Sequence, residues 1–365
     1  MGYSLGIVGL PNVGKSTLFN ALSKAKAEVS NYPFCTIDKN VGVVEVPDER
    51  LEKVREIIGS PKAIPTIIEF LDIAGLVKGA HKGEGLGNQF LSHIRNVDAI
   101  AHVVRCFKDE SIAHIEGNID PKRDIETINL ELILADLASV EKKLEEARAK
   151  AKSGDKKFKK EVEGLLKFKS HFDKGHPLRT QTLSADEKEI LKELPLLTSK
   201  PVLYIANIDE SQISSPEDPC INVISKIAEA EESGIVAICS KLESEIGELP
   251  AEEAKEYLKA AGISELGLSR LIRAGYELLD LITFFTANEK EARAWTVKRG
   301  TKAPQAAGKV HSDMERGFIG AEVIHYNDLV SAESYSKARE KGLIRTEGRD
   351  YTIRDGDLVL IRFSV

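Results

Sequence analysis

The stretch GLPNVGKST, residues 9–17, decides the fold class of this 365-residue chain. Its two glycines followed by lysine and serine (Gly9, Gly14, Lys15 and Ser16) have the P-loop spacing. The glycines let consecutive backbone N–H groups point at one phosphate chain, Lys15 brings a positive charge to the β- and γ-phosphates, and Ser16 offers its hydroxyl to Mg2+. We expect the phosphate contacts of this loop to come from Asn12, Val13, Gly14, Lys15, Ser16 and Thr17.

Apolar patterns on both sides of the loop predict an α/β fold. A short apolar run at 5–9 precedes the loop as a strand, and apolar residues at helical spacing follow it over 17–25. Further buried strands are predicted at 66–71, 99–104, 202–206 and 235–239. Helical patterns separate several of them, which predicts a mostly parallel sheet with helices on both faces, as in a Ras-like G domain.

Composition narrows the class of protein. The chain is 42% hydrophobic and 30% charged, has no run of about eighteen apolar residues, and begins without a signal peptide, so we expect a cytoplasmic protein with no membrane partner. The net charge of −7 argues against coating of nucleic acid by the whole surface and leaves local basic patches open. Four cysteines without metal-ligand spacing are expected to be reduced thiols: Cys35, Cys106, Cys220 and Cys239.

Changes in pattern divide the chain into three parts. We assign 1–128 and 199–280 to the nucleotide-binding domain, 129–198 to an inserted helical arm and 281–365 to a terminal domain. In the arm, the stretch SGDKK at 153–157 separates two apolar stripes and predicts a turn between antiparallel helices. Residues 148–174 hold ten Lys or Arg against four Asp or Glu, so this end of the arm is either a solvated face or a lever that touches nucleic acid or an acidic partner.

The terminal part has the pattern of a small mixed β-sheet with one helix. Paired strands are predicted at 281–286 and 293–299, a short helix begun by Pro304 at 303–315, and a closing turn and strand within 350–365.

Two downstream elements fit a triphosphate with Mg2+. Asp72 directly follows the strand at 66–71 and can hold Mg2+ through water, while Gly75 can donate its backbone N–H to the γ-phosphate. Thr36 lies between the P-loop and Asp72, where a switch threonine would complete the coordination of the metal; the expected metal contacts are thus Ser16, Thr36 and Asp72. The glycine-rich stretch 76–90 is either a segment ordered by nucleotide or a plain long loop.

The segment after the strand at 202–206 favours adenine over guanine. GTP-specific proteins of this architecture carry Asn-Lys-x-Asp here, and the Asp accepts hydrogen bonds from guanine N1–H and its amine. This chain has NIDE, with Ile208 in place of the lysine and Glu210 in place of the aspartate, while Asp209 lies one position early and should point elsewhere. Adenine lacks both donors, so we expect ATP as the nucleotide and GTP as a second substrate. The expected base contacts are Asn207, Ile208, Glu210, Ser240 and Lys241.

These motifs together resemble the YchF/Obg-like ATPase family. The resemblance rests on GLPNVGKST, the threonine in NYPFCTI, DIAGLVKGA, NIDE, the inserted arm and the terminal mixed sheet, and it runs over nearly the full chain. Residues 293–319 are similar to the family's TGS module, a ubiquitin-like β-grasp domain. The resemblance implies a preference for ATP, association with ribosomes and a role in regulating translation or stress responses.

Hydrolysis requires a water in line with the γ-phosphate. Many switch proteins have a glutamine after the DxxG element, but this chain has Leu76, which cannot orient water, so slow intrinsic turnover is expected. His114, in the loop after the strand at 99–104, is the candidate within this chain for orienting the water, and the family resemblance also points to it. His81 is a weaker candidate. The alternative is that His114 is a partly exposed loop histidine without a catalytic role. The catalytic set is therefore Lys15, Gly75 and His114, and Asn12 is a candidate contact for K+.

Three other readings compete with an ATP-driven switch. A scaffold would use nucleotide only for stability, with incidental hydrolysis, and an Obg-type GTPase would differ in the base. A small-molecule kinase also uses a P-loop, but the DxxG series and the lack of an arginine-rich lid disfavour it. In the switch hypothesis, ATP and Mg2+ order the segments around Thr36 and 75–87, and the arm and terminal domain together form a groove for RNA.

Overall fold

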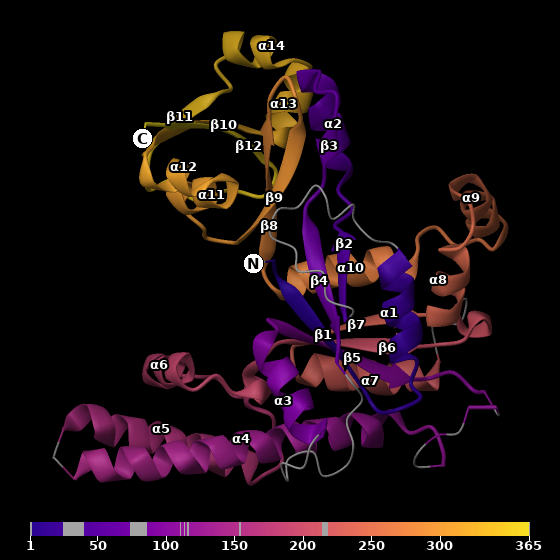
Figure 1. Cartoon of the computed structure of the whole chain (residues 1–365), viewed down its shortest axis with the longest axis vertical. Helices are drawn as coiled ribbons and strands as arrows, with labels where there is room; N and C mark the ends of the chain where they lie inside the picture. The colour runs from indigo at the N-terminus through magenta and orange to yellow at the C-terminus, as the bar shows by residue number, and fades with distance from the viewer. Residues whose placement is uncertain are drawn as a thin grey trace.

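The computed structural model describes residues 2–24, 40–73, 86–109, 111–112, 114, 117–152, 155–213 and 218–364. Its first sheet has six strands in the order β2-β4-β1-β5-β6-β7, with β2 antiparallel to β4 and all other neighbours parallel (Figure 1). The strands are β1 (Ser4–Val8), β2 (Val41–Glu45), β4 (Ile67–Asp72), β5 (Ala99–Arg105), β6 (Val202–Asn207) and β7 (Gly234–Ile238). The five strands predicted for this sheet all form, whereas β2 was not predicted.

The centre of this sheet carries the main hydrophobic core. Every residue of β5 and β6 is buried, as expected for parallel strands covered on both faces. The helices of this domain are α1 (Lys15–Lys24), α3 (Leu86–Asn96), α7 (Pro219–Ala230), α8 (Ser240–Ile246), α9 (Ala251–Ala260) and α10 (Gly267–Leu278). The sheet order and these helices confirm the doubly wound α/β class.

A helical hairpin forms the inserted arm. Helix α4 (Pro121–Ala151) packs antiparallel against α5 (Lys156–Phe172), and the seam includes Val140, Leu165 and Phe168, all fully buried. Helix α4 starts ahead of the expected arm boundary at 129, because Asp120 caps it and Pro121 occupies its first turn. Its first turns belong to the core of the sheet domain, so one continuous helix links the two parts.

The chain returns from the arm through short helices that tie it to the sheet. These are η3 (Leu178–Thr180), α6 (Ala185–Glu193) and η4 (Leu197–Ser199). Arg179 of η3 donates from Nε to Glu231 Oε2 at 2.8 Å, and the hydroxyl of Tyr204 on β6 donates to the same oxygen at 2.7 Å. Arg179 also donates to Asn129 of α4 at 2.8 Å, so a buried polar network holds the arm's base on the sheet.

The terminal domain is a second sheet with the arrangement of a β-grasp. Its order is β11-β10-β12-β8-β9-β3, in which β12 and β8 are a parallel central pair, each with an antiparallel neighbour on its other side (β10 and β9), and α11 packs on one face. Its elements are β8 (Leu281–Ala287), β9 (Ala292–Lys298), α11 (Ala303–Val310), α12 (Ser312–Arg316), β10 (Phe318–His325), α13 (Tyr326–Ala332), α14 (Tyr335–Glu340), β11 (Arg345–Glu347) and β12 (Asp357–Phe363). The single helix predicted at 303–315 is divided in two, because His311 has an extended backbone.

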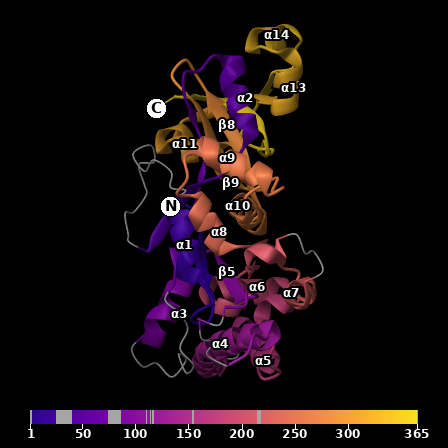
Figure 2. The ribbon, with the colours of Figure 1, turned by 90° about the vertical axis from the view of Figure 1, so that its right-hand side faces the viewer.

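The sixth strand of that sheet comes from the first quarter of the chain. Between β2 and β4 the chain leaves the first sheet, forms α2 (Glu49–Ile58), and adds β3 (Ala63–Ile64) alongside β9. Leu51 and Val54 of α2 pack in one apolar cluster with Phe285 of β8. The sequence patterns did not separate this excursion from its surroundings. Both views place the arm and the terminal sheet at opposite ends, with the first sheet between them (Figures 1 and 2).

Candidate nucleotide site

The P-loop joins β1 to the first turn of α1, as its spacing predicts. A Cβ atom on Gly9 would lie 2.5 Å from the carbonyl oxygen of Val103 on β5. Gly14 has a φ of +95°, and a Cβ there would lie 2.1 Å from Nδ2 of Asn207. Both positions therefore exclude a side chain, one by contact with a neighbouring strand and the other also by its backbone conformation. The N-terminal end of α1, which begins at Lys15, faces the cavity described next.

A cavity of about 710 Å3 brings together most of the predicted nucleotide contacts. It is lined from three separate segments by Asn12, Gly14, Lys15, Ser16, Thr17, Asn207, Ile208, Glu210, Ser240 and Lys241. Val13 is buried beneath it and contributes its backbone to the contact with Asn207. The volume is in the range of small-molecule sites, and one end is formed by the phosphate loop and the other by the predicted base-reading residues.

Asn207 joins the P-loop to the two segments that carry the predicted base contacts. Its Nδ2 donates to the carbonyl oxygen of Val13 at 2.8 Å, and its Oδ1 accepts from the backbone N–H of Ser240 at 3.1 Å. Its own carbonyl accepts from the backbone N–H of Cys106 at 2.8 Å. Because Asn207 is buried, these bonds replace water for its side chain and fix the P-loop relative to the base end.

Lys15 is a buried cation beside a carboxylate. Its Nζ donates to the carbonyl oxygens of Gly9 at 3.0 Å and Leu10 at 2.7 Å. Burial lowers the pKa of Lys15 to about 8, partly offset by the negative charge of Asp72. Burial likewise raises the pKa of Asp72, against the opposing effect of Lys15. Asp72 compensates only part of the cost of burying this ammonium group. The negative charge of a bound phosphate would stabilise the charged form of Lys15 further.

Two of the three expected metal contacts lie in the described residues. Ser16 is exposed to the cavity, and Asp72 is the last residue of β4, electrostatically coupled to Lys15. In the described part of the chain no group of three or more His, Cys, Asp or Glu side chains could cage a metal. One hydroxyl and one carboxylate fit Mg2+, which keeps waters and takes its other ligands from phosphate. Thr36, Gly75, Leu76 and His81 lie outside the described residues.

The base end of the cavity contains two carboxylates that already accept protein hydrogen bonds. Asp209 caps η5 (Glu210–Gln212), with its Oδ1 accepting from the backbone N–H of Ser211 at 2.9 Å. Glu210 accepts from the hydroxyl of Tyr257 on α9 at 3.0 Å. Ile208 is almost fully buried and adds an apolar wall.

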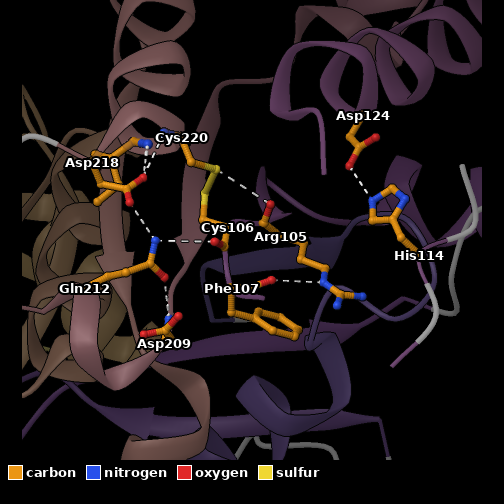
Figure 3. Close-up of a disulfide and its surroundings, with 10 residues drawn as sticks. Arg105, Cys106, Phe107, His114, Asp124, Asp209, Gln212, Asp218 and Cys220 are labelled. Atoms are coloured by element: carbon orange, nitrogen blue, oxygen red, sulfur yellow. Dashed lines mark hydrogen bonds and ion pairs between the residues drawn. A yellow bond between two sulfur atoms is a disulfide. The ribbon is translucent and has the colours of Figure 1, made fainter. Parts of the chain in front are cut away.

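The sequence patterns did not predict that the segment after β5 also lines the base end of the cavity. Phe107 and Lys108 follow β5 directly and line the cavity. The guanidinium carbon of Arg105 lies 4.4 Å from the centre of the Phe107 ring, and Nε of Arg105 donates to the carbonyl oxygen of Phe107 (Figure 3). Arg105 also donates to the carbonyl oxygen of Asp109. Their position at the carboxyl end of a central strand was the available signal, because such ends form ligand crevices in open α/β sheets.

Two cysteines form a disulfide behind this segment. Cys106 and Cys220 are bonded, with Cα atoms 5.7 Å apart and 114 positions between them in the chain (Figure 3). The prediction of reduced thiols is therefore wrong for this pair, because folding places the end of β5 beside the first turn of α7. Gln212 reinforces the junction by donating to Asp218 at 2.7 Å. Cys239 is free and buried, and Cys35 lies outside the described residues.

His114 lies apart from the residues that line the cavity. Its Nε2 lies 3.0 Å from Oδ2 of Asp124 in the first turn of α4, and its side chain is 6% exposed. Figure 3 shows the ring turned toward Asp124, on the far side of Arg105 from the disulfide. The structure thus brings together the predicted phosphate and base contacts, and holds the predicted catalytic histidine on an acidic partner.

The P-loop, the aspartate at the end of β4 and the asparagine at the end of β6 are the parts of a P-loop nucleotide hydrolase of the G-domain class. Comparison with known proteins agrees: residues 4–135 match a family described as 50S ribosome-binding GTPase, and residues 281–364 match the YchF GTPase C-terminal family, described as a protein of unknown function.

Full-length relatives identify the family. The chain is 52% identical to "Ribosome-binding ATPase YchF" of Bacillus subtilis and 50% identical to the protein of that name from Escherichia coli O157:H7, with 100% of each chain covered. The solved structure of the Schizosaccharomyces pombe YchF GTPase superposes with a TM-score of 0.88 at 38% identity, covering 99% of this chain and 98% of that one. The chain belongs to the YchF family. In the part of the chain described here, no helix is both long and apolar enough to cross a bilayer.

Proposed function

We propose that this chain binds ATP with Mg2+ in the 710 Å3 cavity and hydrolyses it slowly, as a switch read by the ribosome. The observation that carries the choice of base is that the two carboxylates that directly follow Asn207 and Ile208, those of Asp209 and Glu210, accept hydrogen bonds from the protein itself. Guanine would need a carboxylate acceptor for its N1–H and its amine, whereas adenine needs none. The names of the relatives from Bacillus subtilis and Escherichia coli support the same nucleotide.

In this proposal, different residues of the site bind different parts of the Mg2+-nucleotide complex. Lys15 neutralises the β- and γ-phosphates, and backbone N–H groups around Gly14 hold the phosphate chain. Ser16, Thr36 and, through water, Asp72 would hold Mg2+, which supplies charge neutralisation between the two outer phosphates. Asn12 remains a candidate contact for K+. Gly75 would donate to the γ-phosphate, and Leu76 leaves the water without a glutamine to orient it.

His114 is the proposed group that positions the water. Its ring contacts Asp124 and does not line the cavity, so in this proposal the contact with Asp124 opens before His114 positions the water. This requirement agrees with slow turnover in the absence of a partner, because the catalytic geometry has to be assembled by a movement.

The proposed partner is ribosomal RNA, which implies a cytoplasmic location. The relatives' name supports the ribosome, and the exposed lysines at the arm's tip supply a basic surface for phosphates. That surface consists of Lys152, Lys156, Lys157 and Lys159. Several other lysines of the arm are paired with carboxylates, among them Lys160 with Asp186 at 2.9 Å and Lys167 with Glu187 at 3.0 Å. The terminal β-grasp domain, proposed as a TGS module, is the second contact.

Affinities for ATP and GTP, measured by calorimetry on one preparation with Mg2+, test the nucleotide. We expect tighter binding of ATP, loss of hydrolysis in Lys15→Ala, and a lower turnover rate with little change in ATP affinity in His114→Ala. Tighter binding of GTP would instead identify an Obg-type GTPase, and retained turnover in Lys15→Ala would overturn the site.

Cosedimentation with ribosomes tests the partner. Reversing charges at the tip (K156E/K157E) should weaken cosedimentation and make it less sensitive to salt, because fewer phosphate contacts form. The matched control is K188E/K192E on α6, which changes net charge equally. Ribosomes that alter neither turnover nor nucleotide affinity would leave a nucleotide-stabilised scaffold as the better description.

A further inference from the structure

Glu210, at the base end of the cavity, is contacted by a residue from a separate helix. Tyr257 lies on α9, and its hydroxyl donates to Oε1 of Glu210 at 3.0 Å. Glu210 lines the cavity at the position where guanine-specific proteins of this architecture have an aspartate. The contact joins residues 47 positions apart, and nothing in the local sequence of either one indicates it.

We propose that Tyr257 is a specificity-determining residue, which disfavours guanine by holding the Glu210 carboxylate. The proposal rests on the ATP preference proposed above and assigns it to a hydrogen bond rather than to the substitution of aspartate by glutamate alone. A glutamate is one methylene longer than an aspartate and rotates about one more bond, so on its own it could still turn toward a purine and accept its donors.

Guanine recognition by a carboxylate uses both carboxylate oxygens, one for N1–H and one for the exocyclic amine. With the hydroxyl of Tyr257 on Oε1, Glu210 can offer this paired acceptor only by giving up an existing hydrogen bond. Binding of guanine would then exchange one hydrogen bond for another, and the net gain would be small. The hydroxyl of Tyr257 remains a donor at neutral pH, because the hydrogen bond to Glu210 raises its pKa further above the ordinary value.

The same contact suits adenine. Adenine presents an acceptor at N1, where a free carboxylate would face it without an intervening proton. The hydrogen bond from Tyr257 satisfies one oxygen of the carboxylate and directs that oxygen toward α9. Asp209 does not substitute as a guanine acceptor, because its Oδ1 accepts from both the backbone N–H and the hydroxyl of Ser211, at 2.9 Å and 2.5 Å.

The test is Tyr257→Phe, which removes one oxygen atom and keeps the ring. We expect the affinity for GTP to rise about threefold to tenfold, because the contact is exposed to solvent and each partner can exchange it for water, with ATP affinity changed less than about twofold. Inosine triphosphate has N1–H but no 2-amino group, so its gain should lie between those of ATP and GTP. The control is Tyr335→Phe, whose hydroxyl donates to Glu322 at 3.1 Å in the terminal sheet, remote from the cavity.

A double-mutant cycle separates this role from a rearrangement of α9. In a Glu210→Ala background, Tyr257→Phe should no longer alter the ratio of GTP to ATP affinity, because the carboxylate that it releases is missing. An unchanged ratio in Tyr257→Phe, or an equal shift with and without Glu210, would overturn the proposal. Failure of the proposed function gives a different result from failure of this inference. If the proposed function is wrong, the wild-type protein either binds neither ATP nor GTP or binds GTP more tightly than ATP.

Discussion

Arg50 and Asp355 connect two parts of the chain that are 305 positions apart: Nη1 of Arg50 donates to Oδ2 of Asp355 at 2.7 Å. Arg50 stands at the start of α2, inside the excursion between β2 and β4, and also donates to its own helix cap, Asp48. Strand β4 begins at Ile67, just after this excursion, and ends at Asp72, so a single strand links the aspartate of the phosphate site to the segment that Arg50 holds on the terminal sheet. This gives a short covalent route from the nucleotide to the terminal domain.

Removing that ion pair should loosen the excursion. Arg50→Met and Asp355→Asn should each destabilise the terminal domain, and their double-mutant coupling should be about 1 kcal/mol at low salt, since both side chains are partly exposed and screened. The measurement is urea unfolding of the four proteins in the cycle. Arg299→Met, which breaks a fully surface-exposed pair with Asp280, is the control and should cost little. A coupling that vanishes even at low salt would contradict this role.

Asn207 should matter for folding as well as for nucleotide binding. Asn207→Ala leaves the carbonyl of Val13 and the N–H of Ser240 without this partner, at a cost of about 1–3 kcal/mol for each buried group. Gly14→Ala should act through the same residue, because its Cβ would displace Nδ2 of Asn207. We therefore expect the two substitutions to be less than additive in unfolding free energy and in ATP affinity. Additive losses would show that they act independently; the exposed Asn222→Ala should have no effect on either quantity.

ATP affinity should fall as the pH rises above the pKa of Lys15, which is about 8 in the ligand-free protein. Phosphate binding requires the ammonium form and raises that pKa, so binding above this pH takes up a proton, and affinity should fall by up to about tenfold per pH unit. Calorimetry in buffers of different ionisation enthalpy measures this uptake. An ATP affinity that does not change with pH in this range would show that Lys15 stays charged. The control substitution Lys24→Gln should leave the pH dependence of ATP affinity as it is in the wild type.

The stability of the ligand-free protein should have the opposite pH dependence to ATP affinity. The pKa of Lys15 falls from 10.5 unfolded to about 8 folded, so the unfolded chain binds more protons between these values. The contribution of Lys15 to the free energy of unfolding should therefore rise with pH across this window and be absent from Lys15→Gln.

The disulfide predicts a definite thiol count. With one bond among four cysteines, two thiols should react with a chromogenic disulfide reagent after denaturation without reductant, and four after reduction. Reduction should lower the melting temperature of the wild type, because the bond closes a long loop that then opens in the unfolded state. The C106S/C220S protein should melt at the same temperature with and without reductant. Four reactive thiols at the outset would contradict the bond.

Local spacing made much of the phosphate end predictable. Gly9, Gly14 and Lys15 lie within seven positions of each other, and the strand and helix around them have clear periodicity, so both the site and the α/β class followed from short-range pattern. The same holds for the paired strands β8 and β9. Strand β3 was missed because two residues carry little periodic signal, whereas β2 was missed although it is as long as β1 and β7.

The features of the fold and of the site that were not predicted depend on contacts between segments that are distant in the sequence. The sequence by itself determined that the chain holds a triphosphate, since the P-loop's chemistry is contained in one stretch and its backbone. Only the tertiary structure decided that Cys106 meets Cys220, that β3 joins the terminal sheet, and that Tyr257 donates a hydrogen bond to Glu210. Each of these depends on which strands become neighbours, and that is settled by burial of the whole core rather than by any local pattern.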